Sequence, residues 1–251
     1  TCPDCPSDPF KSEKDPGSWP ANSMVAIEDK LGERIEFEAN SGIGFDEFHF
    51  IEDRVGAEAL SGMTHFFGNS DNKAPNQALA CHKKDIVADA AGKASCLKPV
   101  VYLQDMGISF GGRRIYHNSR MNFKKWAKEK IWDDPARCVL HLNKTHTSSL
   151  TGTDSTGREL HQIGEKARQM MISRLSLLSR AQLIDIFTAA RAPLREPQHT
   201  AEEWADLFLS KVEKLRNPMG DKTKPGFACP YEVVPPNSAQ PAPQDPFSHY
   251  N

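Results

Sequence analysis

The run Val100–Gly111 reads Val-Val-Tyr-Leu-Gln-Asp-Met-Gly-Ile-Ser-Phe-Gly, an apolar, β-branched segment typical of a strand that ends in Asp-x-Gly. A polar run precedes it, Asp71–Asn76, which reads Asp-Asn-Lys-Ala-Pro-Asn. The stretch before the polar run, residues 54–67, is compatible with a helix. The second half of the chain is rich in helical periodicity. The sequence therefore predicts an α+β fold that is mainly α, with strand 99–104 among its few strands.

The polar side chains of the two runs match the needs of phosphoryl transfer. Moving a phosphoryl group gathers negative charge on its oxygens, so catalysis relies on positioning and on neutralisation by Mg²⁺. Mg²⁺ prefers oxygen ligands and keeps several waters, so one amide and one carboxylate suffice beside the phosphates. Asn76 and Asp105 are the candidate Mg²⁺ ligands. Asp71 is the candidate to orient the attacking hydroxyl, and Lys73 to stabilise the charge on the transferred group.

The spacing Asp71-x-Lys-x-x-Asn76, followed by Asp105-x-Gly, resembles the catalytic loop and metal-binding segment of the protein-kinase-like superfamily. Asp-x-Gly-x-x-Phe-Gly after an apolar strand resembles the secretory-pathway Golgi-type kinases and a group of exported bacterial proteins. Further runs that fit the bacterial group are Cys2–Pro6, Trp126–Lys128 and Trp132–Cys138. The resemblance implies a kinase-like large lobe with short strands around the metal-binding loop. It implies ATP and Mg²⁺ as cofactors if the chain is active.

The polar run has an ordinary alternative, because Asn, Asp, Lys and Pro are also the residues of turns. Kinases, moreover, place a small lobe with a Gly-rich loop, a strand Lys and a helix Glu before the catalytic loop. Here Val25–Glu28 has Glu where that Lys would stand, and the Gly-rich Ser41–Phe45 follows it instead of preceding it. Because the chain starts at Thr1, we expect the small lobe to lie upstream or to be missing. The isolated chain should then bind ATP weakly.

Three functions remain open at this point. The first is a kinase-like phosphotransferase core, which the complete set of polar side chains favours. The second is a catalytically silent kinase-fold (pseudokinase) assembly subunit of an exported complex, which the absent Gly-rich loop and the long tail favour. The third, a zinc or redox module, rests on Cys2-x-x-Cys5 alone, and His82 is the only easy further zinc ligand. No His follows the Cys-x-x-Cys, so no haem is expected, and zinc is not favoured.

Cysteines are the best guide to the compartment. The six cysteines are an even set that allows 15 connectivities, and in an exported protein they predict up to three disulfides. Cys81 with Cys96 is the first choice, because this pair brackets a polar insertion between the polar run and the strand. Cys229 is expected to pin the start of the tail. We therefore expect an exported protein, periplasmic or extracellular.

The chain divides into an irregular Cys-containing segment, residues 1–23, a kinase-like large lobe, residues 24–217, and a Pro-rich extended tail, residues 218–251. A capping box is expected at Thr200, ahead of an apolar helical stripe that Asn217 ends. The tail is a candidate docking segment for a protein partner. The basic loop Gly111–Arg114 is either a solvated loop or a contact for an acidic or phosphorylated partner.

Net charge and hydropathy exclude two other kinds of partner. The formal net charge is −2, so no general attraction to nucleic acid or to a membrane surface is implied. No apolar stretch approaches the ~20 residues that a membrane helix needs. We therefore expect neither a nucleic-acid partner nor a membrane span.

Overall fold

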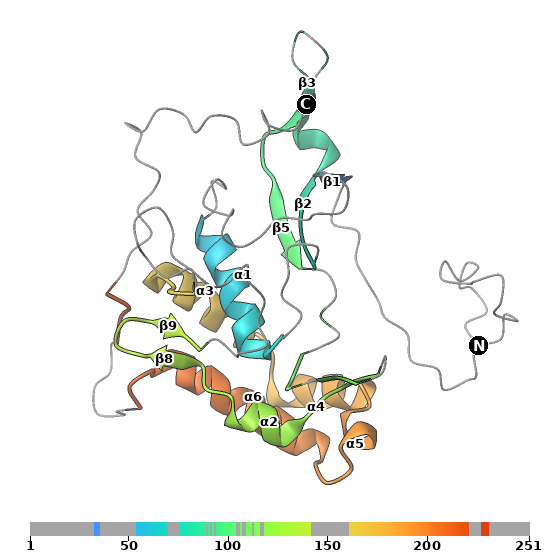
Figure 1. Ribbon diagram of the computed structural model, residues 1–251, viewed down its shortest axis with the longest axis vertical. Coiled ribbons are helices and arrows are strands. Elements are labelled where there is room, and N and C mark those ends of the chain that lie inside the picture. The colour runs from blue at the N-terminus through green and yellow to red at the C-terminus, as the bar shows by residue number, and fades with distance from the viewer. Residues whose placement is uncertain are drawn as a thin grey trace, which may run out of the picture. The chain divides into compact units, whose positions relative to one another are not determined.

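The computed structural model describes residues 33–35, 54–69, 76–88, 90, 92, 94–103, 106, 109–111, 113–115, 118–141, 161–220 and 227–230. All of them belong to one compact unit, Gly32–Asn251. Its helices (Figure 1) are α1 (Arg54–Phe67), α2 (Phe123–Lys128), α3 (Glu165–Leu175), α4 (Arg180–Ala189), α5 (Ala192–Arg195) and α6 (Ala201–Arg216). Its strands are β1 (Glu33–Ile35), β2 (Gln77–Cys81), β3 (Ile86–Ala88), β4 (Ala94–Cys96), β5 (Val100–Leu103), β6 (Arg113–Ile115), β7 (Asn118–Arg120), β8 (Trp132–Asp134) and β9 (Val139–Leu140).

Helices outweigh the short strands, so the predicted α+β, mainly α class is confirmed. The expected segment 1–23 and all but four residues of 221–251 lie outside the described residues. Within the described ranges, no helix combines the length and the apolarity that a membrane crossing requires.

The three-stranded sheet has the order β1-β2-β5, and both pairings are antiparallel. In the β2–β5 ladder Gln77 pairs with Leu103, and Ala80 pairs with Val100. Every residue of β2 is buried, which suits a central strand of small and aliphatic side chains. The predicted strand 99–104 is confirmed as β5.

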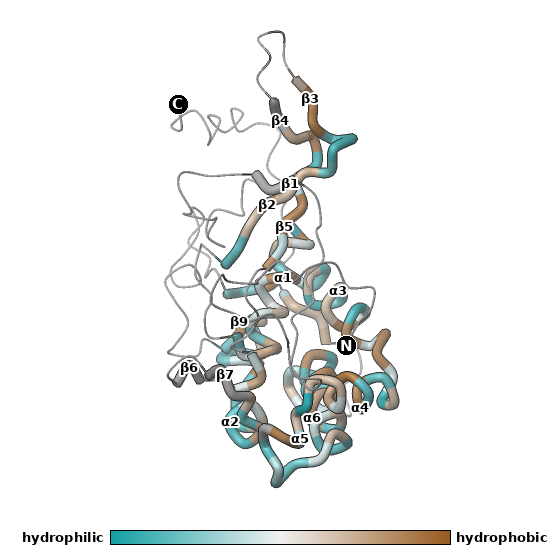
Figure 2. Tube along the Cα trace, turned by 90° about the vertical axis from the view of Figure 1, so that its right-hand side faces the viewer, coloured by the Kyte–Doolittle hydropathy of each residue, from teal (hydrophilic) through white to brown (hydrophobic). Residues whose placement is uncertain are grey.

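The polar insertion between β2 and β5 is a hairpin of β3 and β4 with exposed β3 side chains. Figure 2 shows that β3 is apolar, although Ile86 and Val87 are 39% and 37% exposed. Two strands alone are marginal in water. The Cys81–Cys96 disulfide, with the two Cα atoms 5.9 Å apart, closes the base of the hairpin, as predicted.

An aromatic core joins the helices. Trp126 of α2 and Trp204 of α6 are fully buried and stack with ring centroids 5.9 Å apart. Phe66 of α1 meets Phe208 of α6 edge to face at 5.1 Å. Such pairs add ~0.5–1.5 kcal/mol each beyond area burial. The core therefore binds α1, α2 and α6 into one body.

Helix α6 begins and ends where its sequence predicts. The Glu203 N–H donates to the Thr200 hydroxyl at 3.3 Å, and the Thr200 N–H donates to the Glu203 carboxylate at 2.8 Å. This reciprocal capping box satisfies two helix-end donors. Asn217 ends the helix, and the predicted capping box is confirmed.

Candidate functional site

The structure describes one of the four predicted site residues. Asn76 is half-buried and directly precedes β2. Asp71, Lys73 and Asp105 lie outside the described residues, so the convergence of the four side chains stays a prediction. Among the described side chains, no three His, Cys, Asp or Glu residues gather closely enough to hold a metal ion. Cys2 and Cys5 also lie outside them.

The β2–β5 register brings the ends of the two predicted loops together. The polar loop enters β2 at Gln77, and the second loop leaves β5 at Leu103. These two residues are partners in the ladder. Because the strands are antiparallel, the chain reaches Asn76 and leaves Leu103 at the same end of the pair.

Two hydrogen bonds link the other flanks of the loops. The buried Asn69 amide donates to the Met106 sulfur at 3.2 Å, and Met106 is the residue after Asp105. The Phe110 N–H donates to the Phe67 carbonyl at the end of α1, at 2.6 Å. The described residues that flank the two loops are therefore linked to each other on both sides.

Phe110 and Gly111 anchor the second loop in the aromatic core. Both are left-handed, with φ of 57° and 73°. This conformation costs an aromatic residue of order 1–3 kcal/mol and persists only where packing imposes it. Here the Phe110 ring lies 5.0 Å from Trp126 and 5.5 Å from Phe67, centroid to centroid. A Cβ on Gly111 would stand 2.5 Å from the Asn122 carbonyl, so that position needs glycine.

Helix α2 braces the start of the polar loop. The Trp126 indole N–H donates to the Phe66 carbonyl at 3.0 Å in the last turn of α1. Gly68 follows with φ of 63°, and a Cβ there would meet the Glu129 carboxylate. The exit of the chain from α1 toward Asp71 is thus set by α2 and by Glu129.

Lys211 of α6 is a buried lysine that contacts Glu129 and Trp126. Its side chain is 1% exposed, and its Nζ donates to the Glu129 carbonyl at 2.8 Å. The Nζ also lies 5.1 Å from the centre of the Trp126 ring. Burial lowers the pKa of Lys211 to about 8, opposed by the Glu129 carboxylate and assisted by the charge of Lys214. Helical periodicity places Lys211 on α6 but gives no sign of this role.

The titration of Lys211 is expected to add to the stability of the protein as the pH rises into the alkaline range. Between the folded pKa of about 8 and the ordinary value of 10.5, the unfolded chain holds a proton that the folded chain has released. The free energy of unfolding therefore rises with pH across this window, by about 3 kcal/mol in total at 1.36 kcal/mol per pKa unit. Urea denaturation at a series of pH values measures the rise. A Lys211→Met variant should lose this rise, whereas Lys166→Met, at an exposed position of α3, should keep it.

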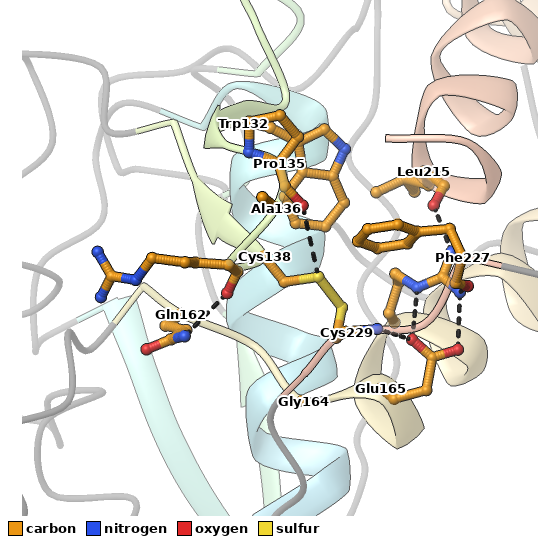
Figure 3. The surroundings of a disulfide bond; sticks show 12 residues. Trp132, Pro135, Ala136, Cys138, Gln162, Gly164, Glu165, Leu215, Phe227 and Cys229 are labelled. Atoms are coloured by element: carbon orange, nitrogen blue, oxygen red, sulfur yellow. Dashed lines mark hydrogen bonds and ion pairs between the residues drawn. A yellow bond between two sulfur atoms is a disulfide. The ribbon is translucent and has the colours of Figure 1, made fainter. Parts of the chain in front are cut away.

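The segment 227–230 at the start of the tail is held to the helices by Cys138, Arg168 and Glu165, a set of contacts called the clasp below. The disulfide Cys138–Cys229 joins the turn between β8 and β9 to a residue 91 positions later, as Figure 3 shows. Cys138 is fully buried and Cys229 is 5% exposed. The expectation that Cys229 pins the start of the tail is confirmed, and its partner, which the sequence does not identify, is Cys138. Disulfides persist in oxidising compartments, so both bridges are compatible with an exported protein.

Arg168 of α3 completes the clasp from the other side. It is 1% exposed and binds the Glu165 carboxylate through two N–H groups, at 2.8 and 2.7 Å. Its remaining donors reach the Leu215 carbonyl at 2.7 Å and the Phe227 carbonyl at 2.8 Å. One guanidinium thus joins α3, the end of α6 and the tail segment 227–230.

Glu165 is the acceptor that organises the clasp. It receives Arg168, the Cys229 N–H at 2.7 Å and the Gln169 amide at 2.7 Å. Burial acts to raise the pKa of Glu165, but these hydrogen bonds and the Arg168 charge together hold it below the ordinary value. The carboxylate is therefore ionised at neutral pH, and the pair is fully hydrogen-bonded.

Compared with family models, with curated proteins and with solved structures, the chain matches none of them.

Proposed function

We propose that the chain is the core of a kinase-like phosphotransferase that moves a phosphoryl group from ATP to a hydroxyl with the help of Mg²⁺. In this proposal Asn76 and Asp105 hold the metal ion, Asp71 orients the hydroxyl, and Lys73 stabilises the transferred group. The observation that carries the proposal is the pairing of Gln77 with Leu103. It supports the meeting of the two loops at one end of the β2–β5 ladder.

The anchoring of both loops supports the same proposal. Phosphoryl transfer depends on groups that are held in place before the reaction, because positioning removes much of the entropic barrier. The Asn69–Met106 and Phe110–Phe67 hydrogen bonds restrain the loops relative to each other. The strained backbone at Phe110 is of the kind that clusters at functional sites.

The test is metal binding by matched variants. Calorimetry with Mg²⁺ should detect a site in the wild-type chain, and Asp105→Asn should weaken it by at least about tenfold, because a carboxylate ligand is lost. Asp185→Asn makes the same chemical change at an exposed position of α4 and should leave binding unchanged. Equal Mg²⁺ affinity in the two variants would contradict the assignment of Asp105.

A measurement of ATP binding then distinguishes an active phosphotransferase core from a catalytically silent one. We expect the isolated chain to bind ATP with Mg²⁺ weakly, since Glu28 stands where the strand Lys would be and the Gly-rich run follows that strand instead of preceding it. Tight, Mg²⁺-dependent ATP binding would mean that a small lobe lies unrecognised in the first seventy residues. A metal site without any ATP binding, even with upstream sequence added, would favour the second candidate function.

The second candidate is an assembly subunit in which the tail binds a partner protein. Its support is the clasp, because Cys229 and Phe227 are fixed to the helical core by a disulfide and by Arg168. A Pro-rich segment that starts from a fixed point loses less entropy when it binds than one on a mobile stem. Removing residues 231–251 should then abolish capture of that partner while leaving Mg²⁺ binding intact.

A further inference from the structure

An open depression of about 490 Å³ lies beside helix α2. Six residues with polar groups line it, and three of them are lysines: Asn122, Lys124, Lys125, Lys128, Glu129 and His141. These side chains belong to α2, to its two flanking residues and to the end of β9. None of them is a residue of the proposed phosphoryl-transfer site.

Positive charge in the depression is only partly compensated. Lys125 lies 3.7 Å from the Glu129 carboxylate. The described part of the chain places no carboxylate within ion-pair distance of Lys124 or Lys128, and both are exposed. These two lysines stand four residues apart on one helical face, where like charges destabilise a helix by ~0.2–0.5 kcal/mol. An anion between them would convert that repulsion into attraction.

His141 adds a rigid polar group to the same wall. Its ring Nδ1 lies 2.7 Å from the Asp133 carboxylate, which leaves Nε2 as the ring nitrogen for a ligand. The backbone N–H of His141 donates to the Ile131 carbonyl at 2.8 Å. The backbone carbonyl of His141 lies 3.0 Å from Nδ1 of the His65 ring. The ring is therefore held through Nδ1, and the His141 backbone is held by two further hydrogen bonds.

The surrounding sequence extends the positive charge. Between Met106 and Trp132 the chain carries seven Lys and Arg residues and one acidic residue, Glu129, although the whole chain is −2. Behind Glu129 lies the buried ammonium of Lys211. Positive charge is thus concentrated between Met106 and Trp132, and this segment supplies most of the residues that line the depression.

The chemistry of the lining selects among anions. Several ammonium groups around one hollow suit a compact dianion with several oxygens, and Lys is a common phosphate binder. Single-stranded nucleic acid is commonly bound by stacking its bases on exposed aromatic rings. Here Trp126 is fully buried, and Phe123 is stacked on His199 at 3.9 Å between centroids. A single carboxylate would engage fewer of the lysines.

We propose that the α2 depression binds a dianionic phosphate monoester group, with Lys124 and Lys128 as its principal contacts and Lys125, Asn122 and His141 around them. The group can be carried by a phosphorylated side chain of a partner protein or be present as free phosphate. The proposal does not depend on phosphoryl transfer by the chain, and it gives the basic surface after Asp105 a ligand.

Direct binding tests the proposal without nucleotide or metal. The full chain, in EDTA at about 0.15 M ionic strength, is titrated with inorganic phosphate and with an otherwise neutral peptide that carries one phosphoserine. We expect both to bind, and the same peptide with Glu or Ser in place of phosphoserine to bind at least about tenfold more weakly. Tighter binding of the phosphopeptide than of phosphate identifies a protein source, and equal affinity identifies the phosphate group itself as the ligand.

Matched lysine variants locate the site. K124Q/K128Q should weaken the binding of phosphate and phosphopeptide at least about tenfold, since two of the contacting charges are removed. K84Q/K166Q removes the same charge from exposed positions outside the depression and should bind like the wild type. Thermal melting checks that both variants fold. Unchanged binding by K124Q/K128Q, or equal affinity for the Glu and phosphoserine peptides, would overturn the proposal. Because EDTA is present, either result leaves the Mg²⁺ test of Asp105 unaffected.

Discussion

Replacing Arg168 with Met is expected to lower the free energy of unfolding by about 3–5 kcal/mol, the usual cost of removing one partner of a buried ion pair. The guanidinium is 1% exposed, and its donors reach one carboxylate and the carbonyls of Leu215 and Phe227. Met fills a similar volume but leaves Glu165 as a charge without its cation. Chemical denaturation without a reductant, so that the disulfides stay intact, measures the loss.

Arg180 provides the matched control for Arg168. It also forms a two-pronged pair with a carboxylate, Asp206, at 2.7 and 3.0 Å, but both side chains are exposed. Exposed pairs contribute little because water screens them. Arg180→Met should leave the unfolding free energy nearly unchanged. A loss from Arg168→Met as small as that expected from Arg180→Met would show that the buried network around Glu165 adds little stability.

The Cys138–Cys229 disulfide is expected to stabilise the fold more than the Cys81–Cys96 disulfide. The first links residues 91 positions apart, and the second links residues 15 apart. In the chain-entropy model a longer closed loop removes more freedom from the unfolded chain, which gives about 4–5 kcal/mol for the first and about 3 kcal/mol for the second. C138A/C229A and C81A/C96A test this difference by denaturation of the unreduced proteins.

Coupling between the disulfide and Arg168 gives this prediction a second readout. Both hold the segment 227–230, so adding Arg168→Met to C138A/C229A should cost less than the sum of the separate losses. Adding Arg168→Met to C81A/C96A should be additive, because the hairpin shares no contact with Arg168 among the described residues. A greater loss of unfolding free energy from C81A/C96A than from C138A/C229A would contradict the prediction that Cys138–Cys229 is the more stabilising disulfide.

Local signals in the sequence predicted local structure well. The start of α6 follows from Thr200 and Glu203, because the capping box is made by residues three apart. Strand β5 follows from its β-branched run. The Cys81–Cys96 pair follows from the polar insertion that it brackets. Helix α1 has the predicted bounds, Arg54–Phe67.

The interactions between segments that are far apart in the chain could not be predicted from local sequence signals. Nothing near Lys211 in the sequence distinguishes a lysine that will be buried under Trp126 from the exposed lysines of other helices. Arg168 likewise sits in a helix of ordinary composition. Six cysteines allow 15 pairings, and only folding brings Cys138 to Cys229. The role of Phe110 as an anchor depends on rings from four helices.

By itself the sequence determined the α+β, mainly helical class, helix α1 before the polar loop, strand β5 and the hairpin disulfide, and it supplied Asn76 and Asp105 as candidate ligands. These depend on residues close together in the chain, whose spacing sets periodicity, capping and strand propensity. Only the tertiary structure decided that Gln77 lies opposite Leu103 and that Arg168 and Cys138 fix the segment 227–230. Such contacts join residues that are far apart in sequence, and they form because burying the aromatic core outweighs the entropy of closing the loops between them.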